Sequence, residues 1–297
     1  MIPGPLPQVR NCVMKDSNSA QSSAIAAFRA LHESGCFVLP NPWDVGSAIY
    51  LRHLGFKALA TTSAGFAFSQ GLPDSVSAVP RDVMLAHIRE VVAATPLPVN
   101  ADFQTGYADE PQGVAANVGL CIATGVAGLS IEDASGESAT PLYEFDLAVE
   151  RVRAARATID ASGIPVVLTA RCEAWLVGQT DPARVALERL VAFAEAGADC
   201  LFAPGVREPD EIAAIVKAVS PQPVNVLVSA PNPALSVSRL ADLGVRRISV
   251  GSALARVAWG AFMRAAQSIA ETGSFDSFAA AAPFSEINDV VVSGGSV

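Results

Sequence analysis

Two short apolar segments of the chain each end in acidic residues where a loop is expected to begin. The first closes on Asp102, and the second closes on Glu132 and Asp133. Carboxylates are uncommon in strands and are rarely buried unpaired, because removing the charge from water is costly. A hard divalent cation would compensate both strand ends, and oxygen-only ligands favour Mg²⁺ or Mn²⁺. A buried salt-bridge network with Arg171 is the alternative explanation.

Two further side chains are suited to the same chemistry. Gln104 follows Asp102 by two residues, which places it on the same face of an extended chain, where it could contact a metal-bound water. Arg171 ends another apolar segment, and its planar guanidinium can hold a carboxylate in a two-pronged contact. A structural ion pair with Glu132 or Glu173 is the alternative role for this arginine.

Histidine is absent from the ends of the predicted strands. His32, His53 and His87 all fall in stretches with helical spacing, and two of them shortly precede a glycine that suits a helix end. We therefore expect structural roles for them and no histidine-based acid/base chemistry or zinc site. The sequence TTSAG at 61–65 follows an apolar segment and offers backbone N–H groups and hydroxyls to an anion.

These residues need a fold that gathers the ends of several strands. Eight short apolar segments alternate with longer segments of helical spacing that often end in glycine. The predicted strands are 36–40, 58–62, 97–103, 128–132, 166–170, 200–203, 224–229 and 247–250. Eight such units predict a single α/β domain, a (β/α)8 TIM barrel, with its active face at the strand C-termini. An open doubly wound sheet is the lesser alternative, because the sequence has no Gly-x-Gly-x-x-Gly turn.

The segments at the two ends of the chain fall outside the eight units. A helix is expected over 24–33, and residues 1–23 are expected to form a loose lead-in. A longer helix is expected over 253–271, followed by 275–281 and a polar Ser/Gly tail. Residues 253–297 thus form a predicted C-terminal helical extension, whose apolar face would pack on a neighbouring subunit.

Composition excludes several classes of function. The 297 residues carry a formal net charge of −9 without a basic cluster, which argues against nucleic-acid binding. Hydrophobic residues make up 51%, yet every apolar stretch of bilayer-spanning length is broken by a charge, Gly or Pro, so no membrane span is expected. Five scattered cysteines without a C-x-x-C pair, and no apolar signal-peptide core, predict a cytoplasmic protein.

At these residues the chain resembles the isocitrate lyase/phosphoenolpyruvate mutase superfamily, from about residue 37 to about residue 259. The motifs that carry the resemblance are NPWDVGSA at 41–48, TTSAG at 61–65, GLPD at 71–74, DFQTGY at 102–107, IED at 131–133, TAR at 169–171, VNVL at 224–227 and SVGSA at 249–253. The resemblance implies a Mg²⁺-dependent TIM barrel that acts on 2-oxo or 2-hydroxy carboxylates through an enolate-like species, at C–C or C–P bonds.

The resemblance also implies roles for individual residues. Asp102 and Glu132 would be metal ligands, directly or through water, and Arg171 would hold the carboxylate end of the substrate. Asp74 would be a catalytic or metal-shell carboxylate. The remaining substrate-binding candidates are Trp43, Ser63, Ala64, Gly65 and Asn225. Members are usually tetramers that exchange C-terminal helices, so we expect a homo-oligomer, either a dimer or a tetramer.

Two positions depart from the family pattern. Gln104 stands where members usually carry a second acid, and the neutral side chain should weaken metal binding. The lyases of isocitrate and methylisocitrate carry a Lys-Lys/Arg-Cys-Gly-His loop whose thiol works as an acid, whereas residues 134–141 contain neither Cys nor His. Cleavage of isocitrate or methylisocitrate is therefore not expected. Asp74, Tyr107 or a metal water are the candidates for the proton donor.

Together these residues predict a Mg²⁺- or Mn²⁺-dependent lyase or decarboxylase that cleaves a C–C bond in a small 2-oxo or 2-hydroxy dicarboxylate. Its expected partner is a small anionic carboxylate. Phosphonopyruvate hydrolysis or phosphoryl mutation is the alternative enzyme function, although residues 135–140 lack the cations that would favour it. A barrel that has kept the fold and lost the reaction is the alternative from another class.

Overall fold

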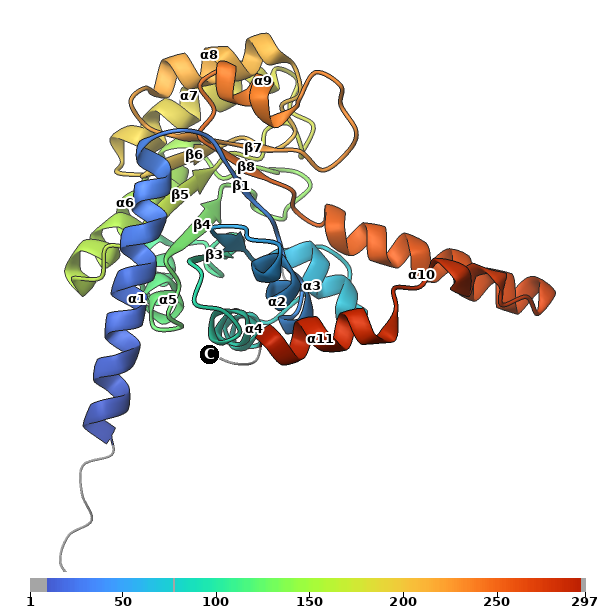
Figure 1. Cartoon of the computed structure of the whole chain (residues 1–297). Coiled ribbons are helices and arrows are strands. Elements are labelled where there is room, and N and C mark those ends of the chain that lie inside the picture. Colours follow the sequence, from blue (N-terminus) through green and yellow to red (C-terminus); the bar gives the residue numbers. More distant parts are fainter. Residues whose placement is uncertain (1–9, 77, 295–297) are drawn as a thin grey trace, which may run out of the picture.

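In the computed structural model, eight parallel strands form a nearly closed barrel surrounded by helices (Figure 1). The structure describes residues 10–76 and 78–294. The strands are β1 Phe37–Leu39, β2 Leu59–Ala60, β3 Val99–Asp102, β4 Gly128–Glu132, β5 Val167–Arg171, β6 Cys200–Phe202, β7 Val224–Leu227 and β8 Arg247–Ser249. They pair in the order β1-β8-β7-β6-β5-β4-β3-β2, and the Ala60 N–H donates to Pro40 O over 3.0 Å where β2 approaches β1. The predicted TIM barrel is confirmed.

Helices follow each of the strands β1 to β7 and cover the outside of the barrel. They are α2 Val45–His53, α3 Ser63–Ser69, α4 Arg81–Ala93, α5 Pro111–Ile122, α6 Phe145–Ser162, α7 Pro182–Glu195, α8 Pro209–Val219 and α9 Val237–Asp242. Three of them begin with proline, whose fixed φ and missing N–H suit the first helical turn. The strands are buried from both sides, which explains why their sequences are almost continuously apolar.

The N-terminal helix is longer than the sequence predicted. Helix α1 spans Arg10–Glu33, so the expected loose lead-in over 1–23 is helical from Arg10 onward, and residues 1–9 lie outside the described residues. Phe28 is fully buried, and Gln21 Nε2 donates to the carbonyls of Ile122 and Val126 at 3.0 and 3.1 Å. These contacts extend the helix across the N-terminal ends of the strands.

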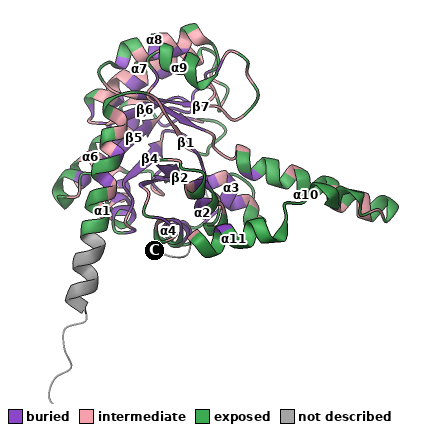
Figure 2. Cartoon of the chain, in the orientation of Figure 1, coloured by how far each residue is buried: buried purple, intermediate pink, exposed green. Residues whose placement is uncertain are grey.

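The C-terminal extension consists of α10 Ala253–Thr272, a 3₁₀ turn at Asp276–Ala280 and α11 Phe284–Gly294. The expected polar tail is therefore wrong, because residues 284–294 form a helix that packs on α2, with Val290 buried. Helix α11 lies along α2, whereas α10 projects from the barrel and is almost entirely exposed (Figures 1 and 2). No helix within the described residues is long and apolar enough to cross a lipid bilayer.

Asn41 ties together the strand ends at which the barrel closes. Its Nδ2 donates to Thr61 O over 2.9 Å, and its Oδ1 accepts from the N–H groups of Val250 and Gly251 at 3.0 and 2.9 Å. The side chain is buried, so these three bonds replace water at the ends of β1, β2 and β8. Asn41 thereby fixes one wall of the barrel mouth.

Candidate active site

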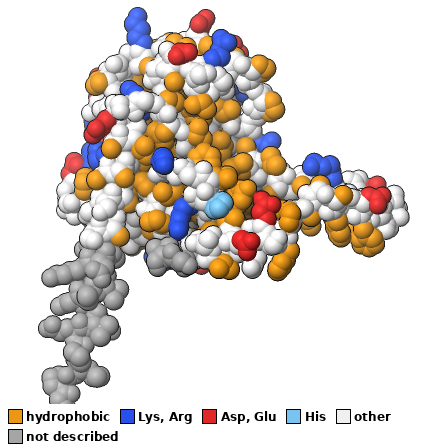
Figure 3. Space-filling model, viewed as in Figure 1, with side chains coloured by type: hydrophobic (Ala, Val, Ile, Leu, Met, Phe, Trp, Pro, Cys, Tyr) orange, Lys and Arg blue, Asp and Glu red, His pale blue; other side chains and the backbone are white. Residues whose placement is uncertain are grey.

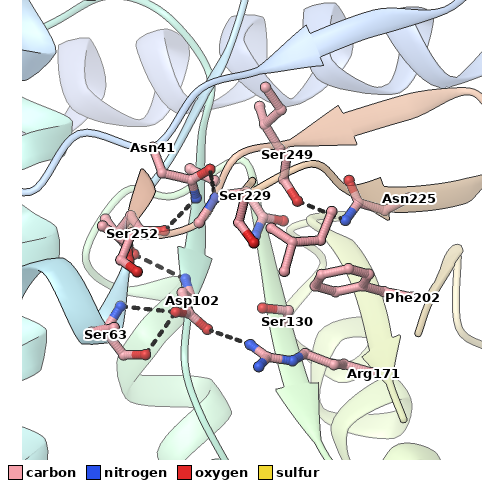
Figure 4. A pocket seen from close by; sticks show the side chains of 18 of the residues that line it. Asn41, Ser63, Asp102, Ser130, Arg171, Phe202, Asn225, Ser229, Ser249 and Ser252 are labelled. Atoms are coloured by element: carbon pink, nitrogen blue, oxygen red, sulfur yellow. Dashed lines mark hydrogen bonds and ion pairs between the residues drawn. The ribbon is translucent and has the colours of Figure 1, made fainter. Parts of the chain in front are cut away.

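A pocket of about 160 Å³ lies in the mouth of the barrel, at the C-terminal ends of the strands (Figure 4). Active sites of TIM barrels occupy this face. Six of the predicted site residues line the pocket, and they are Ser63, Ala64, Asp74, Asp102, Arg171 and Asn225. Five predicted residues do not line it, and they are Trp43, Gly65, Gln104, Tyr107 and Glu132.

Asp102 ends β3 and is held by Ser63. The Ser63 N–H and Oγ both donate to Asp102 Oδ2 over 2.8 Å, and the Asp102 N–H donates to Thr61 Oγ1 over 2.9 Å. The stretch 61–65, expected as a loop, instead starts α3, because Thr62 caps the helix by accepting from the Gly65 N–H. The first turn of α3 therefore orients the carboxylate toward the pocket.

Arg171 ends β5 and faces three carboxylates. Its Nη1 lies 3.1 Å from Glu132 Oε2 and 3.4 Å from Asp102 Oδ1, and its Nε donates to Glu173 Oε1. Glu132 and Arg171 occupy the same register on β4 and β5, which explains their approach. The ion-pair network that the sequence offered as an alternative role for Arg171 is present.

This network contains more negative than positive charge. Burial raises the pKa of Glu132 to about 8, and Glu173 and Asp102 add to the rise, although Arg171 opposes it. Asp102 and Glu132 offer carboxylate oxygens, the ligand type that Mg²⁺ prefers, and would be the residues to hold such an ion. Within residues 10–76 and 78–294, no three acidic, histidine or cysteine side chains are grouped to hold an ion alone. Water and substrate oxygens would complete the coordination, as Mg²⁺ commonly requires.

Asp133 supports the network from the other side of β4. Its Oδ1 accepts from the Glu173 N–H over 2.8 Å, and its Oδ2 pairs with Arg189 Nη1 at 3.0 Å. Glu132 thus faces Arg171, whereas the neighbouring Asp133 faces Arg189. Asp133 therefore positions Glu173, and its own negative charge is balanced by Arg189.

Gln104 and Tyr107 lie in the turn after β3, outside the pocket. Both adopt left-handed backbone conformations, with φ of 46° and 56°. Gln104 Nε2 lies 3.5 Å from Ser75 O, in the loop that carries Asp74, and Gln104 Oε1 is buried without a hydrogen-bond partner in the described part of the chain. Burial raises the pKa of Tyr107, and the charges of Asp102 and Glu132 raise it further.

Trp43 and Gly65 lie behind the pocket wall formed by Ser63 and Ala64. A Cβ on Gly65 would lie 3.1 Å from Trp43 Cβ and 2.6 Å from Thr62 Cγ2, so only glycine fits this close approach. Both residues therefore shape the wall from behind.

Asp74 lies at the rim of the pocket in the loop after α3, exposed overall. Partial burial of the Asp74 carboxyl raises its pKa, and the negative charge of Asp102 raises it further. The positive charge of Arg171 acts in the opposite direction. A carboxyl with a raised pKa beside a pocket is suited to proton transfer.

Several pocket residues were missed in the sequence. Asn41, Ser130, Phe202 and Arg247 also line the cavity. Arg247 gave no usable signal, since a charged residue at the start of an apolar strand is ordinarily exposed. Residues 134–141 do not line the pocket, which agrees with the missing Cys-Gly-His loop.

The chain was compared with known proteins. A family model for phosphoenolpyruvate phosphomutase matches residues 28–270. Oxaloacetate decarboxylase from Chromohalobacter salexigens is 33% identical over 243 residues, which cover 76% of this chain and 78% of that one. A Burkholderia cenocepacia J2315 structure, provisionally designated a lyase/mutase, is 49% identical with a TM-score of 0.87, covering 91% and 96% of the two chains. Oxaloacetate acetylhydrolase, solved with its product oxalate, is 28% identical with a TM-score of 0.81, covering 91% and 94%.

The barrel and its acidic mouth define an enzyme of the isocitrate lyase/phosphoenolpyruvate mutase superfamily. Within it, the chain belongs to the phosphoenolpyruvate phosphomutase family. The predicted superfamily and the enzyme class, a lyase of this type, are confirmed, so the barrel without catalytic activity is set aside.

Arg151 of α6 holds the turn that follows β3. The side chain is buried and donates to the backbone carbonyls of Thr105, Ala108 and Asp109, the last over 2.6 Å. Its guanidinium carbon lies 3.9 Å from the centre of the Tyr143 ring. One arginine thus satisfies three carbonyls of a turn that contains three left-handed residues, Gln104, Gly106 and Tyr107.

We expect Arg151→Met to lower the free energy of unfolding by about 3 kcal/mol or more, because three carbonyls lose a charged donor in a buried place. Urea denaturation followed by circular dichroism measures this change. The control is Arg153→Met on the same helix, whose side chain is 55% exposed and pairs with Glu150, and its cost should stay below about 1 kcal/mol. Equal losses in the two variants would contradict the role of Arg151.

Proposed function

We propose that the chain is a divalent-metal-dependent lyase or decarboxylase. It cleaves a carbon–carbon bond in a small 2-oxo or 2-hydroxy dicarboxylate through an enolate-like intermediate. The observation that carries the proposal is the cluster of Asp102, Glu132 and Glu173 around Arg171 in the barrel mouth. The cytoplasmic location expected from the scattered cysteines is part of the same proposal.

Each residue has a defined task in this proposal. Asp102 and Glu132 would hold Mg²⁺ or Mn²⁺, directly or through water, whereas Gln104 has no place in this site, because its side chain turns toward Ser75. When bound, the cation would polarise the carboxylate and C2 oxygen of the substrate. Ser63 keeps Asp102 oriented through two hydrogen bonds, so the carboxylate needs no rearrangement when substrate binds.

Arg171 and Asp74 act on the substrate itself. Arg171 lines the pocket, and its guanidinium orients the substrate carboxylate. Its Nη1 lies 3.4 Å from Asp102 Oδ1, so this carboxylate would lie next to the proposed metal ligand. Asp74 at the rim gives or takes the proton, and its raised pKa makes this carboxyl more suited to proton transfer than an ordinary one. Tyr107 is less suited to this task, because it does not line the pocket.

The size of the pocket favours a small substrate. A second cavity of about 240 Å³ adjoins the first and shares Leu176, Leu227 and Ser229 with it. The side chains of Leu176, Val206 and Leu235 in its wall suit an alkyl substituent. Oxaloacetate is the substrate in the names of two relatives, and alkylated malates would extend into the second cavity.

Mg²⁺ binding should release a proton near neutral pH. A pKa of about 8 leaves Glu132 largely protonated at pH 7, and a cation needs the carboxylate form. Affinity should therefore rise from pH 6 to pH 8 and level off above it. Calorimetry in two buffers of different ionisation enthalpy measures the release, which we expect to be about one proton.

The matched control for this experiment is Glu137→Gln, an exposed residue whose loop does not line the pocket. It should bind Mg²⁺ like the wild type, whereas Glu132→Gln should bind more weakly and release no proton. If Glu132→Gln and the wild type behave alike, Glu132 is not a metal ligand.

Oxaloacetate, alkylated malates and phosphonopyruvate, each supplied with Mg²⁺, distinguish the two enzyme functions. We expect C–C cleavage with a pyruvate-type product, and a fall in kcat/KM of about 100-fold or more in Asp102→Asn and Arg171→Met. Arg184→Met on the exposed face of α7 is the control and should retain activity. Turnover of phosphonopyruvate alone would assign the chain to C–P chemistry instead.

We also propose a homo-oligomer, a dimer or a tetramer, assembled through α10. This helix projects from the barrel, and hydrophobic side chains gather along it (Figure 3). Val257, Phe262 and Met263 are 70%, 61% and 60% exposed, which is unusual for a cluster of large apolar residues on one helix. A second copy of the chain would cover them.

Light scattering coupled to size-exclusion chromatography should give a dimer or tetramer for the wild type. The double substitution Phe262→Asp and Met263→Asp should shift the protein to the monomer, because the new charges would be buried in the interface. Leu120→Asp on α5, where the leucine is 44% exposed, is the control and should leave the mass unchanged. A monomeric wild type would refute the assembly.

A further inference from the structure

The inside of the barrel is unusually polar. Small barrels of this class usually fill their interior with branched aliphatic side chains. Here the buried residues of the inner layer include Asn100, Ser130, Thr169, Asn225, Arg247 and Ser249. All of them except Thr169 line the same pocket as Asp102 and Arg171. The polar interior is therefore continuous with the active site.

Arg247 is the charged member of this layer. It is 2% exposed, and its Nε donates to Asn225 Oδ1 and its Nη2 to Thr169 Oγ1, each over 3.0 Å. Its Nη1 lies 3.3 Å from His32 Nε2 on α1. A guanidinium has five N–H donors, so these contacts use three of them.

The histidine contact brings no negative charge. His32 Nδ1 lies 2.7 Å from Phe28 O, so Nδ1 carries the hydrogen and Nε2 offers its lone pair to Arg247. Burial and the charge of Arg247 lower the pKa of His32 to about 3. Every partner of Arg247 is thus neutral at physiological pH.

Arg247 differs in this respect from Arg171 and Arg189, two partly buried arginines that have acidic partners. Arg171 faces three carboxylates and Arg189 pairs with Asp133, whereas no carboxylate of the described residues pairs with Arg247. A buried charge without a counter-ion is costly. Because Arg247 lines the pocket, a bound anion could supply the missing charge.

We propose that Arg247, with Asn225 and Ser249, forms a second anion subsite that receives the distal carboxylate of the substrate. The proposal rests on the proposed function, in which the other carboxylate lies at Arg171. Asn225 Nδ2 donates to Ser249 Oγ over 2.9 Å, which leaves the serine hydroxyl hydrogen and the second amide hydrogen for the ligand. The site thus selects a molecule with an anionic group at each end.

Ligand binding to the wild-type protein tests the subsite without any substitution. The probes are oxalate, malate, and the malate analogue in which the C4 carboxylate is an amide, each titrated by calorimetry with saturating Mg²⁺. Oxalate fills only the reacting end. Malate should bind about 10- to 100-fold more tightly than its amide, because only the carboxylate forms charged hydrogen bonds with Arg247.

Variants assign the difference to the arginine. Arg247→Met should weaken malate binding about 10- to 100-fold and change oxalate binding by less than about twofold. Arg247→Lys should recover part of the loss, because it keeps the charge but not the planar fork. The control is Arg246→Met, since this neighbouring side chain donates to Gly35 O and does not line the pocket.

The outcomes separate the two proposals. If oxalate does not bind the wild type, the proposed function fails. If oxalate binds while malate and its amide bind equally well, the subsite is refuted and the proposed function stands. An equal loss of oxalate and malate binding in Arg247→Met would show a merely structural role and would also refute the subsite. If that variant does not fold, the comparison of malate with its amide decides.

Discussion

The ion-pair network around Arg171 governs the barrel mouth. Taking three carboxylates and one guanidinium out of water carries a desolvation cost that their mutual attraction repays only in part. The raised pKa of Glu132 is the direct sign of this imbalance. A cation added to this site would therefore give more electrostatic stabilisation than a cation added to a neutral pocket. In the proposed function, the metal ion would offset this excess of negative charge.

Other parts of the structure keep this network in place. Ser63 at the start of α3 holds Asp102, and Asp133 holds Glu173 through its backbone N–H. Both supports come from elements next to the strand that bears the functional side chain, so packing of the barrel fixes them. Asp74 has no such support, because it lies in an exposed loop at the rim. The charges are thus rigidly placed, whereas the proposed proton donor lies on a more exposed segment.

The sequence was sufficient for the barrel and for the residues at the strand ends. Hydrophobic periodicity and composition identify the buried strands. The last residues of three strands are Asp102, Glu132 and Arg171, and there alternate side chains still point to the same face of the sheet. This alternation of side chains ends before Gln104, two residues after Asp102. Gln104 adopts a left-handed φ of 46°, so the chain is no longer extended and its side chain turns toward Ser75 instead of the pocket.

The remaining differences have a common physical cause, which is tertiary contact. Helix α11 was expected as a polar tail because Ser and Gly flank it, yet packing on α2 stabilises it as a helix. Arg247 was missed for the same reason. A strand that begins with arginine resembles an ordinary exposed start, and only the closed barrel shows that this position is buried.

Arg171 and Arg247 show how one residue type acquires opposite roles in a single barrel. Arg171 is surrounded by excess negative charge, so the net field at its end of the pocket favours a cation. Arg247 has only neutral partners, so the field at its end favours an anion. A ligand that enters with a metal at one end and a carboxylate at the other satisfies both fields at once. On the proposed subsite, the polarity of the barrel interior would set the orientation of the ligand, and α1, outside the barrel, would contribute through the contact of His32 with Arg247.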